Sequence, residues 1–173
     1  MRLVGFPKGL RISPEDIRRT ILAQDESPFD KALLVELGET GEIIGQCKLG
    51  SPKAEGIAET DLKLLPHFWG RGFGTELKRA LVCYLFTHTD CNAVQATPSK
   101  ENVASQRMQE AVGAHRVSEG VHRFPEHMRE YTTDVPFYVY RVYREEWLAR
   151  SGGSATPQEA GLQGESPEGG QSE

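Results

Sequence analysis

The chain has no long apolar run. None of its apolar stretches approaches the roughly 20 residues that a membrane-spanning helix needs. The opening segment "MRLVGFPKGLRIS" also lacks the apolar core of a secretory signal peptide. We therefore expect a cytoplasmic protein that does not have a membrane as a partner.

Paired cysteines and an excess of basic residues are missing too. The three cysteines, Cys47, Cys83 and Cys91, are an odd number without a C-x-x-C pair, so the sequence indicates neither a disulfide framework nor a metal site. The formal net charge of −5 argues against nucleic acid as a partner, because neutralising phosphates requires a basic face.

The composition favours one globular domain followed by a tail. The chain has 173 residues, of which 38% are apolar, and this is enough for a single core. From Ser151 onward the sequence is mostly Gly, Ser, Pro, Gln and Glu with a single leucine, so it cannot bury enough apolar surface to offset its ordering entropy. We expect a folded domain over residues 1–149 and a disordered polar tail over residues 150–173.

Turn signals and hydrophobic periodicity divide the domain into helices and strands. Ser13, followed by a proline and two acids, is typical of a helix start, and this helix should run to about Ala23. The segments "KALLVEL" and "EIIGQCKL" flank "GETG", which predicts an antiparallel hairpin. The expected strands cover residues 31–37, 42–49, 57–65, 93–97, 114–121 and 135–143.

Two further helices follow from apolar residues at helical spacing. The first should bury Leu77, Ala80, Leu81, Tyr84 and Leu85 against the sheet. The second contains Ala104, Met108, Ala111 and Val112 and should end at Gly113. Strands and helices in this order predict an α/β (α+β) fold, in which helices cover the faces of a mixed sheet.

A glycine-rich segment lies between the third strand and the next helix. Gly70, Gly72 and Gly74 occupy alternate positions in "HFWGRGFGTELKRAL". Backbone N–H groups at a helix N-terminus converge on bound anions, and glycine lets the backbone approach a phosphate closely. The segment matches neither the Walker pattern nor the G-x-G-x-x-G dinucleotide fingerprint. Taken alone, it fits either another kind of anion site or an ordinary loop.

A second motif strengthens the case for an anion site. "LLPHFWGRGFGTEL", followed about thirty residues later by "ENVASQRMQEAVGA", resembles the two coenzyme-A-binding motifs of the GCN5-related N-acetyltransferase (GNAT) superfamily. Trp69 stands where the superfamily usually has Gln or Arg, and in this respect the loop is similar to the branch that acetylates the N-termini of ribosomal proteins. The two motifs with their strands cover roughly residues 43–121.

The resemblance implies a GNAT-like, mostly antiparallel mixed sheet and an acetyl-CoA-dependent enzyme. Such an enzyme transfers the acetyl group to a primary amine, of a protein N-terminus or a small molecule, by direct attack of the amine on the thioester. The amine acceptor itself is left open. The alternatives are a non-catalytic coenzyme-A-binding module or inactive relative, and an unrelated nucleotide-binding α/β domain.

The resemblance also assigns residues to the cofactor. Backbone N–H groups of residues 70–75 would hold the pyrophosphate, and Arg71 would add a positive charge beside it. The strand end at residues 62–64 would hydrogen-bond the pantetheine arm through its main chain. Asn102 and Ser105 would face the cofactor, although both residue types also cap helices. The full set is Leu62, Lys63, Leu64, Gly70, Arg71, Gly72, Phe73, Gly74, Thr75, Asn102 and Ser105. For Phe68 and Trp69 we expect packing beneath the loop.

Two positions are expected to take part directly in the chemistry. Glu59 is the favoured base, with Asp61 on the same strand face as its alternative, and both could instead be solvated strand carboxylates. The backbone N–H near Leu64 would stabilise the oxyanion.

The superfamily's frequent general acid is a tyrosine, and that position here is Gln109. Water, Tyr138 or Tyr140 could supply the proton instead. Among the histidines only His67 lies beside the loop, and a surface role is expected for each of them.

Relatives usually begin with a strand and a helix that this chain lacks before Ser13. The missing strand would leave backbone groups of residues 31–37 unpaired. We expect either a homodimer that buries this edge or a natural start further upstream.

Overall fold

The structure is a computed structural model that describes residues 13–22 and 27–151. Its helices are α1 (Pro14–Leu22), α2 (Phe73–His88), α3 (Val103–Ala111) and α4 (Arg144–Ser151), with two short 3-10 helices, η2 (Pro66–Phe68) and η3 (Glu126–Met128). Its strands are β1 (Ala32–Leu37), β2 (Glu42–Leu49), β3 (Ile57–Leu64), β4 (Ala93–Ala96), β5 (His115–His122) and β6 (Val135–Tyr143). Every strand expected from the sequence is present.

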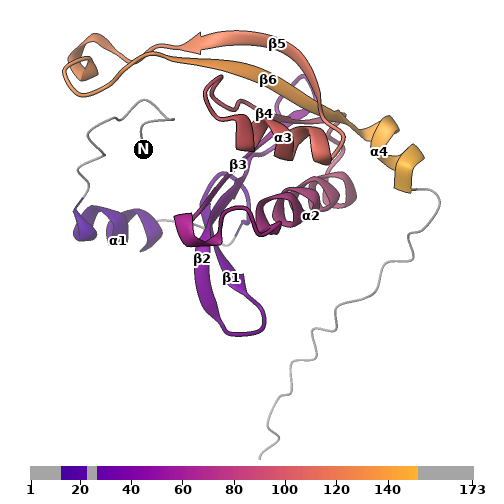
Figure 1. Cartoon of the computed structure of the whole chain (residues 1–173), viewed down its shortest axis with the longest axis horizontal. Helices are drawn as coiled ribbons and strands as arrows, with labels where there is room; N and C mark the ends of the chain where they lie inside the picture. The colour runs from indigo at the N-terminus through magenta and orange to yellow at the C-terminus, as the bar shows by residue number, and fades with distance from the viewer. Residues whose placement is uncertain (1–12, 23–26, 152–173) are drawn as a thin grey trace, which may run out of the picture.

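The six strands form one sheet in the order β1-β2-β3-β4-β6-β5 (Figure 1). All neighbouring strands are antiparallel except β3 and β4, which are parallel. The predicted mixed, mostly antiparallel sheet with flanking helices is therefore confirmed. None of the described helices is long and apolar enough to cross a bilayer.

Helix α1 begins as its sequence predicts. The Ser13 hydroxyl accepts a hydrogen bond from the Asp16 backbone N–H at 3.1 Å and donates one to the Asp16 carboxylate at 2.6 Å. This reciprocal cap satisfies one of the free N–H groups of the first turn. The predicted end at Ala23 lies just outside the described residues.

Helix α2 packs on the sheet with most of the predicted face. Leu81 and Leu85 are buried, and Leu77 and Tyr84 pack against the core, whereas Ala80 is exposed. The fully buried side chains, Lys78, Leu81, Val82, Leu85 and Phe86, keep the spacing i, i+3, i+4, i+7, i+8. Lys78 was left out of the prediction because apolar periodicity does not count a lysine.

Helix α4 was not predicted. It follows β6 without a cap residue and is only eight residues long, so it offers little periodicity. Its first residue, Arg144, donates to the carbonyl oxygens of Phe86 at 2.5 Å, of Cys91 at 2.7 Å and of Thr89. These bonds satisfy carbonyls at the C-terminal end of α2. The expected boundary at residue 149 falls inside this helix, and the expected tail lies outside the described residues.

Strand β1 is an edge of the sheet among the described residues. It pairs with β2, and Leu34 on it is 72% exposed. The expected homodimer across this edge stays a prediction.

Candidate functional site

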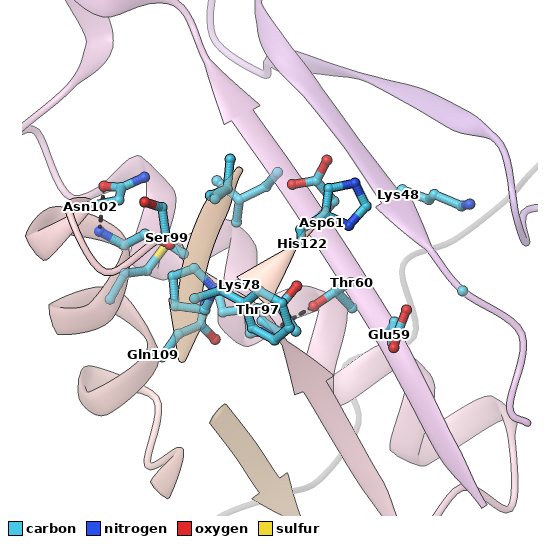
Figure 2. A pocket seen from close by; sticks show the side chains of 18 of the residues that line it. Lys48, Glu59, Thr60, Asp61, Lys78, Thr97, Ser99, Asn102, Gln109 and His122 are labelled. Atoms are coloured by element: carbon cyan, nitrogen blue, oxygen red, sulfur yellow. Dashed lines mark hydrogen bonds between the residues drawn. The ribbon is translucent and has the colours of Figure 1, made fainter. Parts of the chain in front are cut away.

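Strands β3 and β4 separate and leave an open fork. They pair only at Ile57, Ala58 and Glu59 of β3, against residues 93–95 of β4. Beyond β4 the chain follows β6 instead, because the Tyr138 N–H donates to the Pro98 carbonyl at 3.0 Å. A cavity of about 640 Å³ lies at the fork (Figure 2). Residues from β3, α2, α3 and the end of the β5–β6 hairpin line it.

The pairing register decides which main-chain groups face the fork. The Gly50 N–H donates to the Glu59 carbonyl at 2.7 Å, and the Leu65 N–H donates to the Ile44 carbonyl at 2.9 Å. Odd-numbered residues of β3 therefore turn their main-chain groups toward β2. Leu62 and Leu64 turn theirs toward the fork, as the pantetheine prediction requires. Lys63 does not, because its main chain faces β2 and cannot serve the open edge.

The glycine loop adopts a conformation that requires glycine at two positions. Gly70 has φ 71° and Gly72, the N-cap of α2, has φ 90°. Side chains other than hydrogen are strained at such angles. A Cβ on Gly74 would lie 3.3 Å from the Met108 sulfur, so α2 and α3 approach closely there.

The same loop leaves backbone donors available. Among the described residues no backbone acceptor is recorded for the N–H groups of residues 70–74, and the first turn of a helix cannot satisfy its own donors. The Arg71 guanidinium lies 5.5 Å from the Phe68 ring centre and 5.1 Å from that of Phe73. The loop therefore combines free N–H groups with a fixed positive charge, which suits an anion.

Trp69 behaves differently from the prediction. Phe68 is buried as expected, but Trp69 is 64% exposed. Its indole Nε1–H donates to the Leu64 carbonyl at 2.7 Å, so Trp69 covers the end of β3 at the mouth of the fork.

Asn102 and Ser105 combine both roles considered for them. The Asn102 carbonyl Oδ1 accepts a hydrogen bond from the Ser105 N–H at 3.1 Å and caps α3. Both residues also line the cavity. Capping therefore fixes Asn102 at the start of α3 without removing it from the cavity wall.

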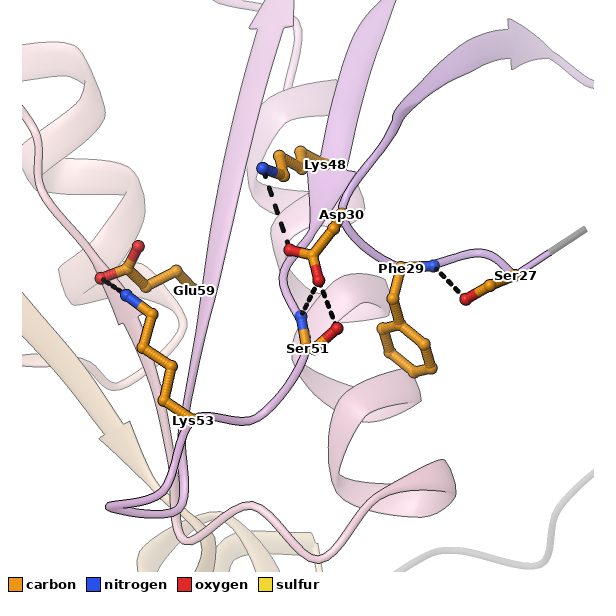
Figure 3. Close-up of polar contacts among 7 residues, drawn as sticks. All are labelled: Ser27, Phe29, Asp30, Lys48, Ser51, Lys53 and Glu59. Carbon is orange, nitrogen blue, oxygen red and sulfur yellow. Dashed lines mark hydrogen bonds and ion pairs between the residues drawn. The ribbon is translucent and has the colours of Figure 1, made fainter. Parts of the chain in front are cut away.

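Two carboxylates, Glu59 and Asp61, line the cavity from the same strand face, on the side away from α2. Glu59 accepts from Lys53 Nζ at 3.1 Å (Figure 3). It also accepts from Gln95 Nε2 at 3.0 Å. Gln95 in turn accepts from Arg141 Nε at 2.9 Å. Asp61 pairs with Lys63 at 3.0 Å.

Asp30 is a further acid that lines the cavity, and it was not predicted. Asp30 has φ 58°, lies 3.9 Å from Lys48 and accepts from the backbone N–H and hydroxyl of Ser51 (Figure 3). The hydroxyl hydrogen bond holds the pKa of Asp30 below its ordinary value, against a smaller opposing effect of burial. The three carboxylates that line the cavity, Asp30, Glu59 and Asp61, are thus each paired with a lysine.

Glu59 and Leu64 lie five positions apart on β3, which at about 3.3 Å per residue puts about 16 Å between their Cα atoms. The N–H group of Leu62 lies nearer to Glu59 and faces the fork, whereas that of Thr60 belongs to the last parallel pair, Glu59 with Gln95.

The residue at this site that sequence reasoning missed is Lys78. It is 1% exposed, lines the cavity from α2, and its Nζ donates to the Thr60 hydroxyl at 2.5 Å (Figure 2). Burial lowers its pKa to about 7, although the negative charge of Asp61 acts in the opposite direction. The sequence signal that could have identified Lys78 is a lysine on the otherwise apolar face of the predicted helix.

The expected proton donors on β6 are not at the cavity. Tyr140 donates its hydroxyl hydrogen to Glu110 at 3.0 Å, and burial raises the pKa of this phenol. Neither Tyr138 nor Tyr140 is among the lining residues, whereas Gln109 is.

His122 lines the cavity from the end of β5, far from the loop in sequence. His67 lies instead 3.8 Å from Glu42 and against the Phe68 ring. Among the described residues no group of three or more His, Cys, Asp or Glu side chains is arranged to hold a metal ion.

Comparison with known proteins gives the family. The model of the acetyltransferase (GNAT) domain matches residues 1–115, well over half of the chain. The chain therefore belongs to the GNAT acetyltransferase family.

Individual relatives are more distant. The N-acetyltransferase p20 of Bacillus licheniformis, itself uncharacterised, is 30% identical over 110 residues, which are 63% of this chain and 60% of p20. A GNAT-family acetyltransferase structure from Bacillus anthracis has TM-score 0.65 and 22% identity, over 83% of this chain and 81% of that chain. The spermidine N-acetyltransferase of Vibrio cholerae, in complex with CoA and spermine, has TM-score 0.67 and 16% identity, over 80% of this chain and 79% of that chain. At these identities the structures support the fold.

Proposed function

We propose that this chain is an N-acetyltransferase that transfers the acetyl group of acetyl-CoA to a primary amine by direct attack on the thioester. The observation that carries the proposal is the fork between β3 and β4, which opens into a cavity beside a glycine loop with free backbone donors. Family membership and a neighbour in complex with CoA support it.

The residues present fit acetyl-CoA in three separate ways. The N–H groups of residues 70–74 and Arg71 offer donors and charge to a pyrophosphate, whereas the predicted donor Thr75 N–H is already bonded to the Gly72 carbonyl at 3.0 Å. Leu62, and Leu64 through its N–H, offer main-chain groups along the open strand edge to the amides of a pantetheine arm, while the Leu64 carbonyl accepts from Trp69. Asn102 and Ser105 form the opposite wall at α3.

The chemistry needs a base on the side from which the amine arrives. Glu59 lines the cavity there, and its partners Lys53 and Gln95 are both donors to its carboxylate. In our proposal Glu59 takes the proton of the attacking amine, directly or through water, and Asp61 is the alternative. The N–H of Leu62 replaces that of Leu64 as the donor to the developing oxyanion, because it lies closer to Glu59.

The acceptor is a primary amine whose class stays open between a protein N-terminus and a small molecule. The carboxylates that line the cavity are each paired with a lysine, so a polycation would have to displace Lys48 from Asp30 or Lys53 from Glu59. The likeness of the loop to the branch that acetylates ribosomal proteins stays a prediction.

The test is thiol release from acetyl-CoA with a panel of amines. The panel should contain peptides with free N-termini, spermidine and an aminoglycoside, and acetylated product should be confirmed by mass. We expect acceptor-dependent release with at least one amine. Tight binding of CoA without release for any acceptor would contradict the enzyme and leave a coenzyme-A-binding module.

A further inference from the structure

Lys78 is a buried amine whose side chain is directed at the cavity. Its Nζ has one recorded hydrogen bond, to the Thr60 hydroxyl at 2.5 Å, and no carboxylate among the described residues lies within ion-pair distance of it. A buried ammonium without a counter-ion is costly, so such a group is seldom found without a role.

The position of Lys78 along the fork is specific. Thr60 is the first residue of β3 beyond the last pair with β4, so the amine that bonds to it lies at the closed end of the fork. Leu62 and Leu64 lead outward from this point toward the glycine loop. A pantetheine arm laid along the open edge, with its pyrophosphate at the glycine loop, would bring its sulfur toward Lys78.

The cavity has different chemistry on its two sides. Glu59 and Asp61 project from one face of β3, whereas Thr60 and Lys78 meet on the face covered by α2. The other described lining residues from α3 and its cap are neutral, with side chains that do not release a proton near pH 7: Asn102, Ser105, Met108 and Gln109. Lys78 is thus the titratable group on the helix side.

We propose that Lys78 is the catalytic acid that protonates the leaving thiolate of coenzyme A. This inference rests on the proposed function. The attacking amine forms the new C–N bond and gives its proton to Glu59, and the C–S bond breaks with its electron pair going to sulfur. Lys78 transfers one Nζ proton to that sulfur and becomes a neutral amine. It regains a proton from water when the product thiol leaves the cavity.

The acidity of Lys78 suits this transfer. An ordinary lysine, with a pKa of about 10.4, is too weak an acid to protonate a thiolate whose thiol has a pKa of about 8.5. Burial lowers the pKa of Lys78 to about 7, so the transfer is downhill and a substantial share of molecules carries the proton at neutral pH. The charged groups that face the same cavity are Asp30, Lys48, Lys53, Glu59 and Asp61, together with His122 of β5.

The test measures the thiol of bound CoA, so it needs no acceptor. Ultraviolet absorbance follows thiolate formation during a pH titration of the CoA complex, for the parent, for Lys78→Arg and for Lys78→Met, in which methionine keeps the apolar stem. A permanent cation beside the sulfur favours the thiolate, whereas Lys78, with a pKa of about 7, is mostly neutral where a thiol with a pKa of about 8.5 ionises. We expect the apparent pKa of the thiol to be about one unit lower in Lys78→Arg than in the parent or in Lys78→Met, a tenfold change in the ionisation constant. Lys48→Met, which removes a lysine on the other side, should leave it unchanged.

Lys78→Arg distinguishes donation of a proton to the sulfur from electrostatic stabilisation of the thiolate by a positive charge. A guanidinium beside the sulfur lowers the thiol pKa but does not release a proton near neutral pH. The inference therefore predicts that kcat falls in both variants while their affinity for CoA stays near that of the parent.

Parental kcat in Lys78→Arg or Lys78→Met, or an unchanged thiol pKa in Lys78→Arg with CoA bound, would overturn the acid role and leave the proposed function standing. A parent that does not bind CoA would overturn both. Melting curves of the variants serve as the folding control. If Lys78→Met does not fold, Lys78→Gln takes its place in the same titration.

Discussion

Glu59 is held in place by two donors to its Oε1, and no hydrogen bond to its Oε2 is recorded among the described residues. Lys53 and Gln95 both point hydrogens at its carboxylate, and Gln95 is itself oriented by Arg141. The chain of contacts fixes the carboxylate at the cavity wall without a competing acceptor. Asp61 has a single ion pair, to Lys63, on the exposed side.

Glu59→Gln should lower kcat by about 10²-fold or more at neutral pH, because the glutamine cannot take the amine proton. The loss should shrink as pH rises, since an α-amine with a pKa of about 8 or a lysine with one of about 10.4 then sheds its own proton. The measurement is kcat against pH for the parent, Glu59→Gln and Asp61→Asn. A larger loss in Asp61→Asn would transfer the role to that residue, and parental rates in both would leave neither as the base.

Lys78 should also impose a pH dependence on stability. Its pKa is lowered from 10.5 to about 7 by burial, so between these values the unfolded chain binds a proton that the folded chain does not. The burial cost is fully present below about pH 7 and disappears as pH rises toward 10.5, with roughly 5 kcal/mol as its upper bound.

Lys78→Met removes this cost. Urea unfolding at several pH values should therefore show the variant more stable than the parent near pH 6, with the gap narrowing toward pH 9 or above. A gap that is independent of pH would mean that Lys78 titrates as an ordinary lysine.

At the scale of elements, the junction of β3, the glycine loop and α2 is the part that the sequence specified best. The alternate glycines predicted a close approach of backbone to a ligand, and the structure places Gly70 and Gly72 at positive φ with open space where a Cβ would be. Because Gly72 has positive φ, Gly72→Glu would strain the loop as well as repel a phosphate, and either effect would lower the affinity for CoA.

Arg71→Ala avoids that strain and tests the charge alone. The Michaelis constant for acetyl-CoA should rise about three- to tenfold, and less at high salt, because a charge beside the pyrophosphate is lost. S-acetylpantetheine, which has no pyrophosphate, should show no such change. Arg79→Ala, which changes an exposed arginine of α2, is the matched control. Equal effects of Arg71→Ala on both donors would place Arg71 away from the pyrophosphate.

The buried face of α2 and the whole of α4 could not be read from the sequence in the same way. Periodicity counts apolar residues, so the predicted buried face of α2 left out Lys78 and included the exposed Ala80. Helix α4 depends on Arg144 bonding three carbonyls at the end of α2 and on Trp147 packing against Phe86, contacts between segments far apart in the chain. Local patterns carry no signal for such contacts.

At the scale of the molecule, the cavity is assembled from segments that no single motif contains. Glu59, Asn102 and Ser105 came from motifs, and they do line it. His122 and Phe137 come from the β5–β6 hairpin, which reaches the cavity only through the order of strands in the sheet. Strand order depends on long-range pairing, so these walls could not be predicted.

The exposed edge at β1 leads to a prediction about assembly. Backbone groups on the outer side of β1 and the exposed Leu34 suit pairing with a second copy. We expect light scattering to report a dimer, with slow hydrogen exchange at residues 32–37 that is lost together with dimerisation in Leu34→Lys. A monomer in which those amides are protected would mean that the chain covers its own edge.

Hydrogen exchange with and without CoA tests the central claim, that the fork and its glycine loop form the acetyl-CoA site, most directly. The N–H groups of residues 70–74 have no recorded acceptor among the described residues, so they should exchange fast in the free protein. With CoA bound, we predict marked protection at residues 60–64 and 70–76, weaker protection at residues 102–105, and no change at β1. Binding of CoA that protects other segments and leaves residues 60–64 and 70–76 exchanging as before would contradict the account.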